Sequence, residues 1–189
     1  GIIWQARDDN YNRGYDLHYL NPIIFYRPVE FSKHSPDNAL LGINVNYDLK
    51  NISFYSQVVL DDINLDRHDN SAGGFFQNKY AIQIGSKTNF TIDKHSFNLL
   101  AEYNKAQPYT YAHKHPLQNY THMNQALAHP LGANFKEKVF LLSHVFDKWA
   151  TKIKYTHAVY GADSANTHYG QNIFISDFLA QGEGGEYSY

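Results

Sequence analysis

Side chains that could bind a ligand are concentrated between residues 107 and 135, in the stretch QPYTYAHKHPLQNYTHMNQALAHPLGANF. A tyrosine combines an apolar ring with a polar hydroxyl, so it can stack on a sugar ring and also bond to the substituents of that ring. Tyr109, Tyr111 and Tyr120 are therefore candidate carbohydrate-binding residues. The alternative is that these rings only pack the segment against the rest of the fold.

Metal binding and catalysis are both poorly supported by the spacing of the possible ligands. His113 and His115 could offer two imidazoles to a metal, but no third ligand follows at a suitable spacing. The stretch DDINLDRHDNSAG begins like an EF-hand calcium loop, yet Arg67 stands where that loop requires glycine and Gly73 where it requires glutamate. No G-x-S-x-G motif occurs, and no carboxylate pair is singled out by its spacing. We predict a protein that is not an enzyme, with no metal and no cofactor.

A second candidate segment, residues 7–38, mixes charges of both signs with aromatic residues. Arg13, Arg27 and Glu30 are candidate polysaccharide-binding residues, and the two arginines suit an anionic polysaccharide because the planar guanidinium group matches a carboxylate. Arg27 and Glu30 could equally pair with each other, or with charges of a barrel interior, and so hold a plug in place.

Strands must position these segments, because period-two alternation runs through most of the chain. In the stretch 40–49, Leu41, Ile43 and Val45 alternate with Gly42 and Asn44. The predicted strands are 40–49, 52–63, 79–87, 96–104, 138–146 and 149–161, with a seventh at about 170–179. The first residues, GIIWQA, read as the end of another strand.

The links between these strands alternate strictly between short and long. Tight turns are predicted after Asp48, Asn89 and Phe146, whereas the long loops are 7–38, 64–77, 106–136 and 161–169. In an up-and-down antiparallel sheet this alternation places every long loop at one end, which is typical of outer-membrane barrels, where the long loops are extracellular. Aromatic residues near the short turns would form a girdle at the membrane interface; they are Tyr47, Phe54, Phe90, Phe97, Phe146 and Trp149.

Composition agrees with a protein that has no nucleic-acid partner. The 189 residues carry 16 Lys and Arg against 18 Asp and Glu, a net charge of -2, without a basic stripe. Tyrosine is abundant, with 16 residues, and this residue type suits boundaries such as the edge of a membrane. No apolar run is long enough for a transmembrane helix. The absence of cysteine excludes disulfides and thiolate sites.

Five phrases in the chain resemble a family of Bacteroidota outer-membrane proteins. They are RGYDLHYLNPIIFYRPVEFS (13–32), SPDNALLGIN (35–44), NKYAIQIGSK (78–87), LLAEYNKAQPYTYAH (99–113) and NQALAHPLGANFKE (124–137). They are similar to the gliding-motility RemB and capsule-assembly Wzi-like proteins. The resemblance implies a partly plugged barrel of about eighteen strands that associates with surface polysaccharide or takes part in gliding.

The prediction is therefore an all-β, antiparallel up-and-down transmembrane barrel, of which this chain forms a single domain and a segment of about seven or eight strands. The expected location is the cell outer membrane, with lipid, surface polysaccharide and other outer-membrane, gliding or secretion proteins as partners. A porin-like channel and a soluble all-β carbohydrate-binding module remain alternatives. Within the long loop 106–136 we expect a short helix around 119–128.

Overall fold

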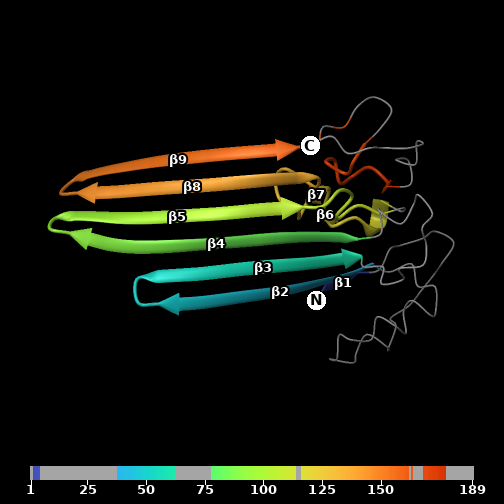
Figure 1. Cartoon of the computed structure of the whole chain (residues 1–189). Helices are drawn as coiled ribbons and strands as arrows, with labels where there is room; N and C mark the ends of the chain where they lie inside the picture. Colours follow the sequence, from blue (N-terminus) through green and yellow to red (C-terminus); the bar gives the residue numbers. More distant parts are fainter. Residues whose placement is uncertain are drawn as a thin grey trace.

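Antiparallel strands make up most of the structure, a computed structural model that describes residues 2–4, 38–62, 78–113, 116–161, 163 and 168–177 (Figure 1). The strands are β1 (Ile2–Trp4), β2 (Asn38–Leu49), β3 (Ile52–Asp62), β4 (Lys79–Ile92), β5 (His95–Ala106), β6 (Thr121–His122), β7 (Gln125–Ala126), β8 (Phe135–Phe146) and β9 (Trp149–Tyr160). The described residues contain almost no helix: the 3-10 turn η4 (Pro116–Gln118) and a 3-10 residue at Asp177. In this part of the chain no helix has the length and apolar character needed to cross a membrane.

Seven strands form one sheet in the order β1-β2-β3-β4-β5-β8-β9, and β6 and β7 form a separate small hairpin. Every neighbouring pair is antiparallel. The predicted all-β antiparallel fold is thereby confirmed.

Three two-residue turns lie together at one end of the sheet, called the turn end (Figure 1). In each turn the first residue has a positive φ, which is 45° at Lys50, 53° at Asp93 and 51° at Asp147. Aspartate adopts this conformation more readily than most residues, which agrees with the turn signals in the sequence. The longer connections leave the sheet at the opposite end, called the loop end.

The register gives the sheet two faces of opposite character, because side chains alternate along each strand and cross-strand partners share a face. The apolar face carries the odd-numbered residues of β2, β5 and β9 and the even-numbered residues of β3, β4 and β8. The polar face carries the alternate residues. Every exposed large hydrophobic residue of these six strands lies on the apolar face, except Val145 and Tyr160.

The predicted strand at about 170–179 is wrong, since residues 168–177 contain no strand. In this segment, side-chain oxygens accept hydrogen bonds from backbone N–H groups that in a strand would donate to a neighbouring strand. The carboxylate of Asp163 accepts from the N–H groups of Tyr169 at 2.8 Å and Asn172 at 3.2 Å. The seventh strand of the sheet is instead β1, at the start of the chain.

The predicted helix around 119–128 is also wrong, because this segment forms the β6–β7 hairpin. Met123 and Asn124 have positive φ angles of 47° and 59°, which a right-handed helix does not tolerate. The N–H of Leu127 donates to the carbonyl of Tyr120 at 3.1 Å and closes the hairpin.

Candidate functional site

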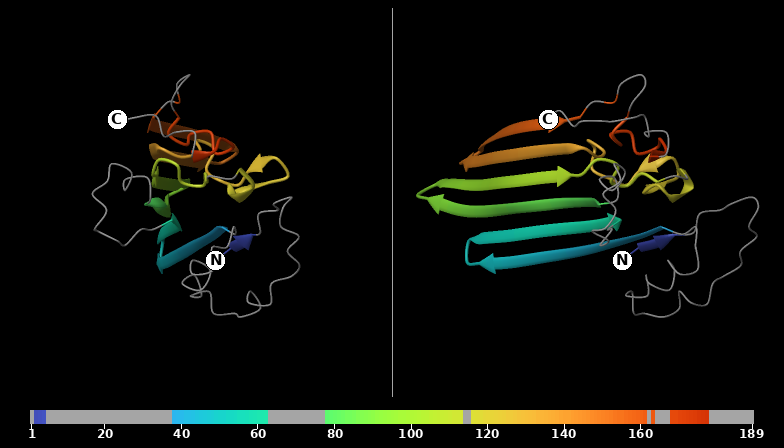
Figure 2. Two further views of the ribbon diagram at one scale, coloured as in Figure 1. Left: turned by 90° about the vertical axis from the view of Figure 1, so that its right-hand side faces the viewer. Right: turned by 45° about the vertical axis from the view of Figure 1, so that its right-hand side comes forward.

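Residues 107–113, 116–134 and 168–177 form a cap at the loop end of the sheet, and Figure 2 shows its β6–β7 hairpin standing to one side of the strands. The cap rests on a register row of the polar face that is small or apolar. This row contains Gly42, Val59, Ala81, Ala106 and Phe135. Six cap residues join this row in the core of the described chain; Tyr111, Ala133 and Ile173 are buried, and Tyr120, Ala128 and Leu131 are partly buried.

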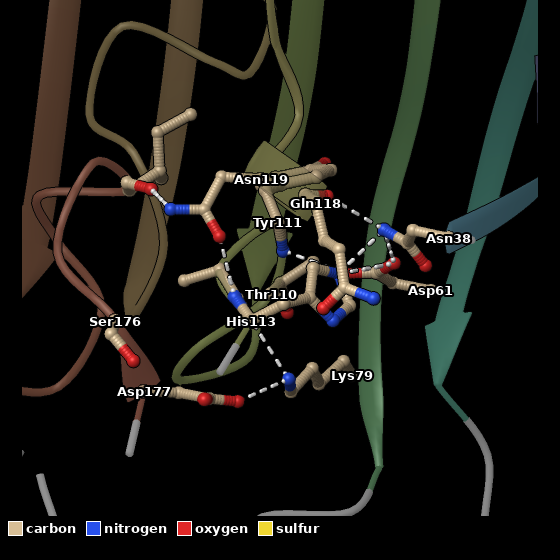
Figure 3. A network of polar contacts seen from close by, with 12 residues as sticks. Asn38, Asp61, Lys79, Thr110, Tyr111, His113, Gln118, Asn119, Ser176 and Asp177 are labelled. Atoms are coloured by element: carbon tan, nitrogen blue, oxygen red, sulfur yellow. Dashed lines mark hydrogen bonds and ion pairs between the residues drawn. The ribbon is translucent and has the colours of Figure 1, made fainter. Parts of the chain in front are cut away.

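A buried carboxylate at the end of β3 anchors the cap to the sheet (Figure 3). A β-bulge between Leu60 and Asp62 interrupts the register there, and the side chain of the extra residue, Asp61, is 0% exposed. Bulges commonly redirect a side chain in this way. The carboxylate of Asp61 accepts from the backbone N–H of Tyr111 at 2.9 Å and lies 3.1 Å from Nε2 of His113.

A second anchor is the ammonium group of Lys79 at the start of β4, which is also buried. Its Nζ lies 2.7 Å from the carboxylate of Asp177 and donates to the carbonyl of Ala112, also at 2.7 Å. A buried ammonium requires such partners, because its transfer out of water is otherwise very costly. The cap has two parts, one that follows β5 and contains Ala112 and one that follows β9 and contains Asp177. Lys79 therefore joins the sheet to both parts (Figure 3).

The amide side chain of Asn119 holds the two parts of the cap together. Its Oδ1 accepts from the backbone N–H of His113 at 2.7 Å, and its Nδ2 donates to the carbonyl of Ile173 at 2.6 Å. The side chain is 1% exposed, so each of these bonds forms in a region without competing water.

Tyr109 fixes a further contact between the two parts of the cap, and this contact requires glycine at position 170. The hydroxyl of Tyr109 donates to the carbonyl of His168 at 2.6 Å. Gly170 has a φ of +82°, and a Cβ there would meet the backbone of Tyr109 at 2.6 Å. Burial raises the pKa of Tyr109 and that of Tyr111 to about 12.

Next to the cap, one register row of the polar face carries a polar residue on five adjacent strands. These residues are Asn44, Gln57, Gln83, Asn104 and Glu137. Among the described residues, neither Gln57 nor Gln83 has a hydrogen-bonding partner for its side chain. The row therefore presents amide groups that can both donate and accept.

Asn104 and two carboxylates form the fixed part of this polar surface. Nδ2 of Asn104 donates to Glu102 at 2.8 Å and to Glu137 at 3.0 Å. Because carboxylates only accept, the nitrogen of this amide must face them and its oxygen must face away. Nε2 of His129 lies 3.2 Å from the same carboxylate of Glu137. Nδ1 of His129 accepts from the N–H of Leu131 at 3.2 Å, so Nε2 of the neutral ring carries the proton.

Tyr55 extends this network across the sheet. Its hydroxyl donates to Glu102, which lies two strands away, and the ring passes over Gly85 on the strand between them. A Cβ at Gly85 would lie 2.2 Å from Cζ of Tyr55. Glycine at this position is therefore a condition for the Tyr55–Glu102 contact.

A cavity of about 320 Å³ lies between the polar row and the cap. The sheet contributes Gln57, Gln83 and Asn104 to its polar wall, and the cap contributes Tyr111, Tyr120 and His129. The rings of Tyr111 and Tyr120 stack with centroids 5.8 Å apart. The rest of the lining is largely apolar and belongs to the core described above.

The predicted carbohydrate-binding residues fall into three groups. Tyr111 and Tyr120 line the cavity, and Tyr120 is only partly buried. Tyr109 lies elsewhere in the cap and is 2% exposed, so its ring packs the cap. Arg13, Arg27 and Glu30 lie outside the described residues, as do most of the loops 7–38 and 64–77.

Sequence reasoning missed the sheet residues of the cavity. The alternation that predicted the strands also places Gln83 and Asn104 on the polar face, and this was the available signal. Their meeting with the cap depends on strand register, which short-range patterns do not specify. The described residues contain no group of three or more His, Asp or Glu arranged to hold a metal ion.

Comparison with known proteins gives no relative: no family model, no curated protein and no solved structure matches the chain.

Proposed function

We propose that this chain forms part of the wall of an outer-membrane β-barrel that is not an enzyme. Its cap lies on the extracellular side, where it associates with surface polysaccharide and, in cells that glide, with the proteins of that machinery. The apolar face meets lipid and the polar face lines the interior, and strands beyond those described complete the cylinder. The observation that carries this proposal is the exposed apolar face of the sheet.

That face is too extensive and too apolar for a surface in contact with water. Its exposed fractions include 70% at Trp149, 60% at Tyr47 and 58% at each of Val45 and Ile153. Soluble monomers seldom expose contiguous apolar patches of more than a few hundred Å². A soluble carbohydrate-binding module would have to leave all these side chains in water, whereas a bilayer would solvate them.

Aromatic side chains occupy the turn end of the apolar face, where a membrane interface would lie. The two strands that each short turn joins carry a cross-strand aromatic pair close to the turn. The pairs are Tyr47 with Phe54, Phe90 with Phe97, and Phe146 with Trp149. The rings of Phe90 and Phe97 stack at 5.2 Å, and His95 stacks on Phe146 at 4.2 Å. This arrangement agrees with the aromatic girdle of membrane barrels.

The apolar region also crosses the sheet obliquely, as tilted strands in a bilayer require. In β2 it runs from Leu49 to Leu41 and is centred on Val45, which shares a register row with Lys138 and His157. In β8 and β9 its centre lies about five residues nearer the turn end, a shift of about 17 Å at about 3.4 Å per residue. Strands β2 and β8 are four strand spacings apart, a lateral distance of about 19 Å. The apolar region therefore slopes by about 40° across the sheet, within the range of roughly 35–45° for strand tilt in membrane barrels.

The sheet has two edges that lipid would not tolerate. Strand β9 has no partner on its outer side among the described residues, and β2 has one only for residues 38–40. Unpaired backbone groups are very unfavourable in hydrocarbon, so a membrane sheet must close into a cylinder. This requirement is the reason for proposing further strands.

The test of the proposal is the partition of the full chain between membrane and water. We expect the protein to stay with outer membranes through alkaline carbonate washing and to be released by detergent. Release by the wash alone would contradict the proposal and favour the soluble module. Conductance in planar bilayers then separates a capped barrel, which should conduct poorly, from a porin-like channel.

A further inference from the structure

The cavity between the polar row and the cap has the size of a small-molecule site. Its volume of about 320 Å³ is at the lower end of the range of roughly 300–1,000 Å³ that is typical of ligand pockets. One wall belongs to rigid strands and the other to a cap that is held by buried polar contacts. Such a site is largely formed before a ligand arrives, which reduces the entropic cost of binding.

The polar groups of the cavity match hydroxyl groups better than charges. Gln57 and Gln83 each offer a donor and an acceptor that no other described residue uses. Oδ1 of Asn104 adds an acceptor, because both N–H groups of that amide are held by carboxylates. A sugar hydroxyl both donates and accepts, so amides that do the same can satisfy it.

The aromatic wall suits the apolar face of a pyranose ring. Tyr120 stacks on Tyr111, which is buried, and this contact holds the ring of Tyr120 at the cavity wall. A fixed ring loses little conformational freedom when a ligand stacks on it. The apolar part of the lining contributes to the same side of the site.

Charge near the cavity disfavours an anionic ligand. The carboxylates of Glu102 and Glu137 accept hydrogen bonds from Asn104, one of the lining residues. Among the described lining residues, the only amine is that of Lys105, whose Nζ lies 5.7 Å from the ring centroid of Tyr80, a residue of the apolar face. An acidic sugar bonded to Asn104 would therefore meet like charge.

We infer that this cavity binds one uncharged pyranose residue of a surface polysaccharide. Gln57, Gln83 and Asn104 bond to its hydroxyl groups, and Tyr120 stacks on its ring. This inference deepens the proposed function and rests on it for the source of the sugar, but the chemistry of the site can be tested separately.

Calorimetric titration of the full chain in an amine-oxide detergent tests this assignment, because glucoside and maltoside detergents would compete for the site. The probes are maltohexaose, chitohexaose and hexagalacturonate. We expect at least one neutral oligosaccharide to bind and the uronate not to bind. Gln83→Leu should weaken that binding by about 5- to 10-fold, the usual effect of one lost hydrogen bond. Asn44→Leu is the matched control, because Asn44 belongs to the same polar row and does not line the cavity.

Three results would overturn the assignment: tighter binding of hexagalacturonate, no binding of either neutral probe, or equal affinity in Gln83→Leu and the parent. Circular dichroism and the heat-induced mobility shift of each variant establish that it is folded. Carbonate extraction of the membranes from which each protein is purified distinguishes the cavity assignment from the membrane proposal. A protein that remains in membranes but binds no neutral sugar refutes only the cavity assignment, whereas one that binds sugar but washes off refutes only the membrane wall.

Discussion

A lysine placed on either side of one strand should distinguish lipid from water at the apolar face. Val45 and Asn46 are neighbours in β2, both are exposed, and their side chains lie on opposite faces of the sheet. Val45→Lys puts an ammonium group at the centre of the apolar run of β2, whereas Asn46→Lys puts it on the polar face. The two variants place the same lysine on the same strand. Val45→Lys also loses strand propensity, but that scale spans only about 1 kcal/mol, so a larger difference between the variants reports the environment of the face.

The size of the expected effect follows from the position of Val45. Near the midplane of a bilayer, a lysine on the lipid side of a barrel costs about 2–4 kcal/mol, and on the interior side it costs little. At an exposed position in water the same substitution usually changes stability by about 0.5 kcal/mol or less. We therefore expect Val45→Lys to lower the free energy of unfolding by about 2–4 kcal/mol, with Asn46→Lys close to the parent.

Equilibrium urea unfolding of the full chain in phospholipid vesicles measures this difference. The dependence of the unfolding free energy on urea should be the same in all three proteins, since this slope reports the surface exposed on unfolding. Equal stability of the two lysine variants would refute the assignment of the apolar face to lipid. A larger loss in Asn46→Lys would reverse the assignment of the two faces.

Three further predictions concern the polar face and the cap. Gly85→Ala should displace Tyr55 and cost about 1–3 kcal/mol of unfolding free energy through loss of a charge-assisted hydrogen bond; Tyr55→Phe should add little to that loss in a double-mutant cycle. Asp61→Asn should leave the buried partners of the bulge unsatisfied and cost about 3–5 kcal/mol, seen as faster proteolysis within residues 107–134 while the strands stay protected. Raised pH should loosen the cap, because Tyr109 and Tyr111 have a pKa of about 12 when folded against 10.0 when exposed. Their contribution to stability is complete below pH 10 and is lost as the pH rises toward 12, which tyrosinate absorbance and proteolysis can follow together; a cap equally protected throughout this range would contradict it.

Much of the sheet could be predicted from the sequence because its determinants are local. Strict alternation in stretches such as 40–49 marked both the strands and their two faces. Tight turns were visible because Asp93 and Asp147 are residue types that accept positive φ. The strand Ile2–Trp4 was also predicted, from the first residues of the chain, although its pairing with β2 is not local. The bulge at Asp61 depends on partners far along the chain, so no local pattern marked it.

The cap was predicted poorly because its conformation is set by contacts between distant segments. Lys79 and Asp177 are 98 residues apart in sequence, and neither carries a local signal for the other. A short helix was expected around 119–128, but the positive φ angles of Met123 and Asn124 fit the hairpin instead. Of the three tyrosines proposed to contact sugar, Tyr111 and Tyr120 line the cavity and Tyr109 does not; their binding of sugar stays a prediction.

The short turns and the distant Lys79–Asp177 contact together predict an order of assembly. In a barrel that enters the membrane from the periplasm, the loop ends must cross the bilayer while the turns stay behind. Each hairpin of adjacent strands can form early, since its contacts are local. The contact between Lys79 and Asp177 requires a segment that lies beyond β9. Closure of the cap is therefore expected as a late step of assembly and, if the chain forms the proposed barrel wall, as a step that follows translocation of the cap segments.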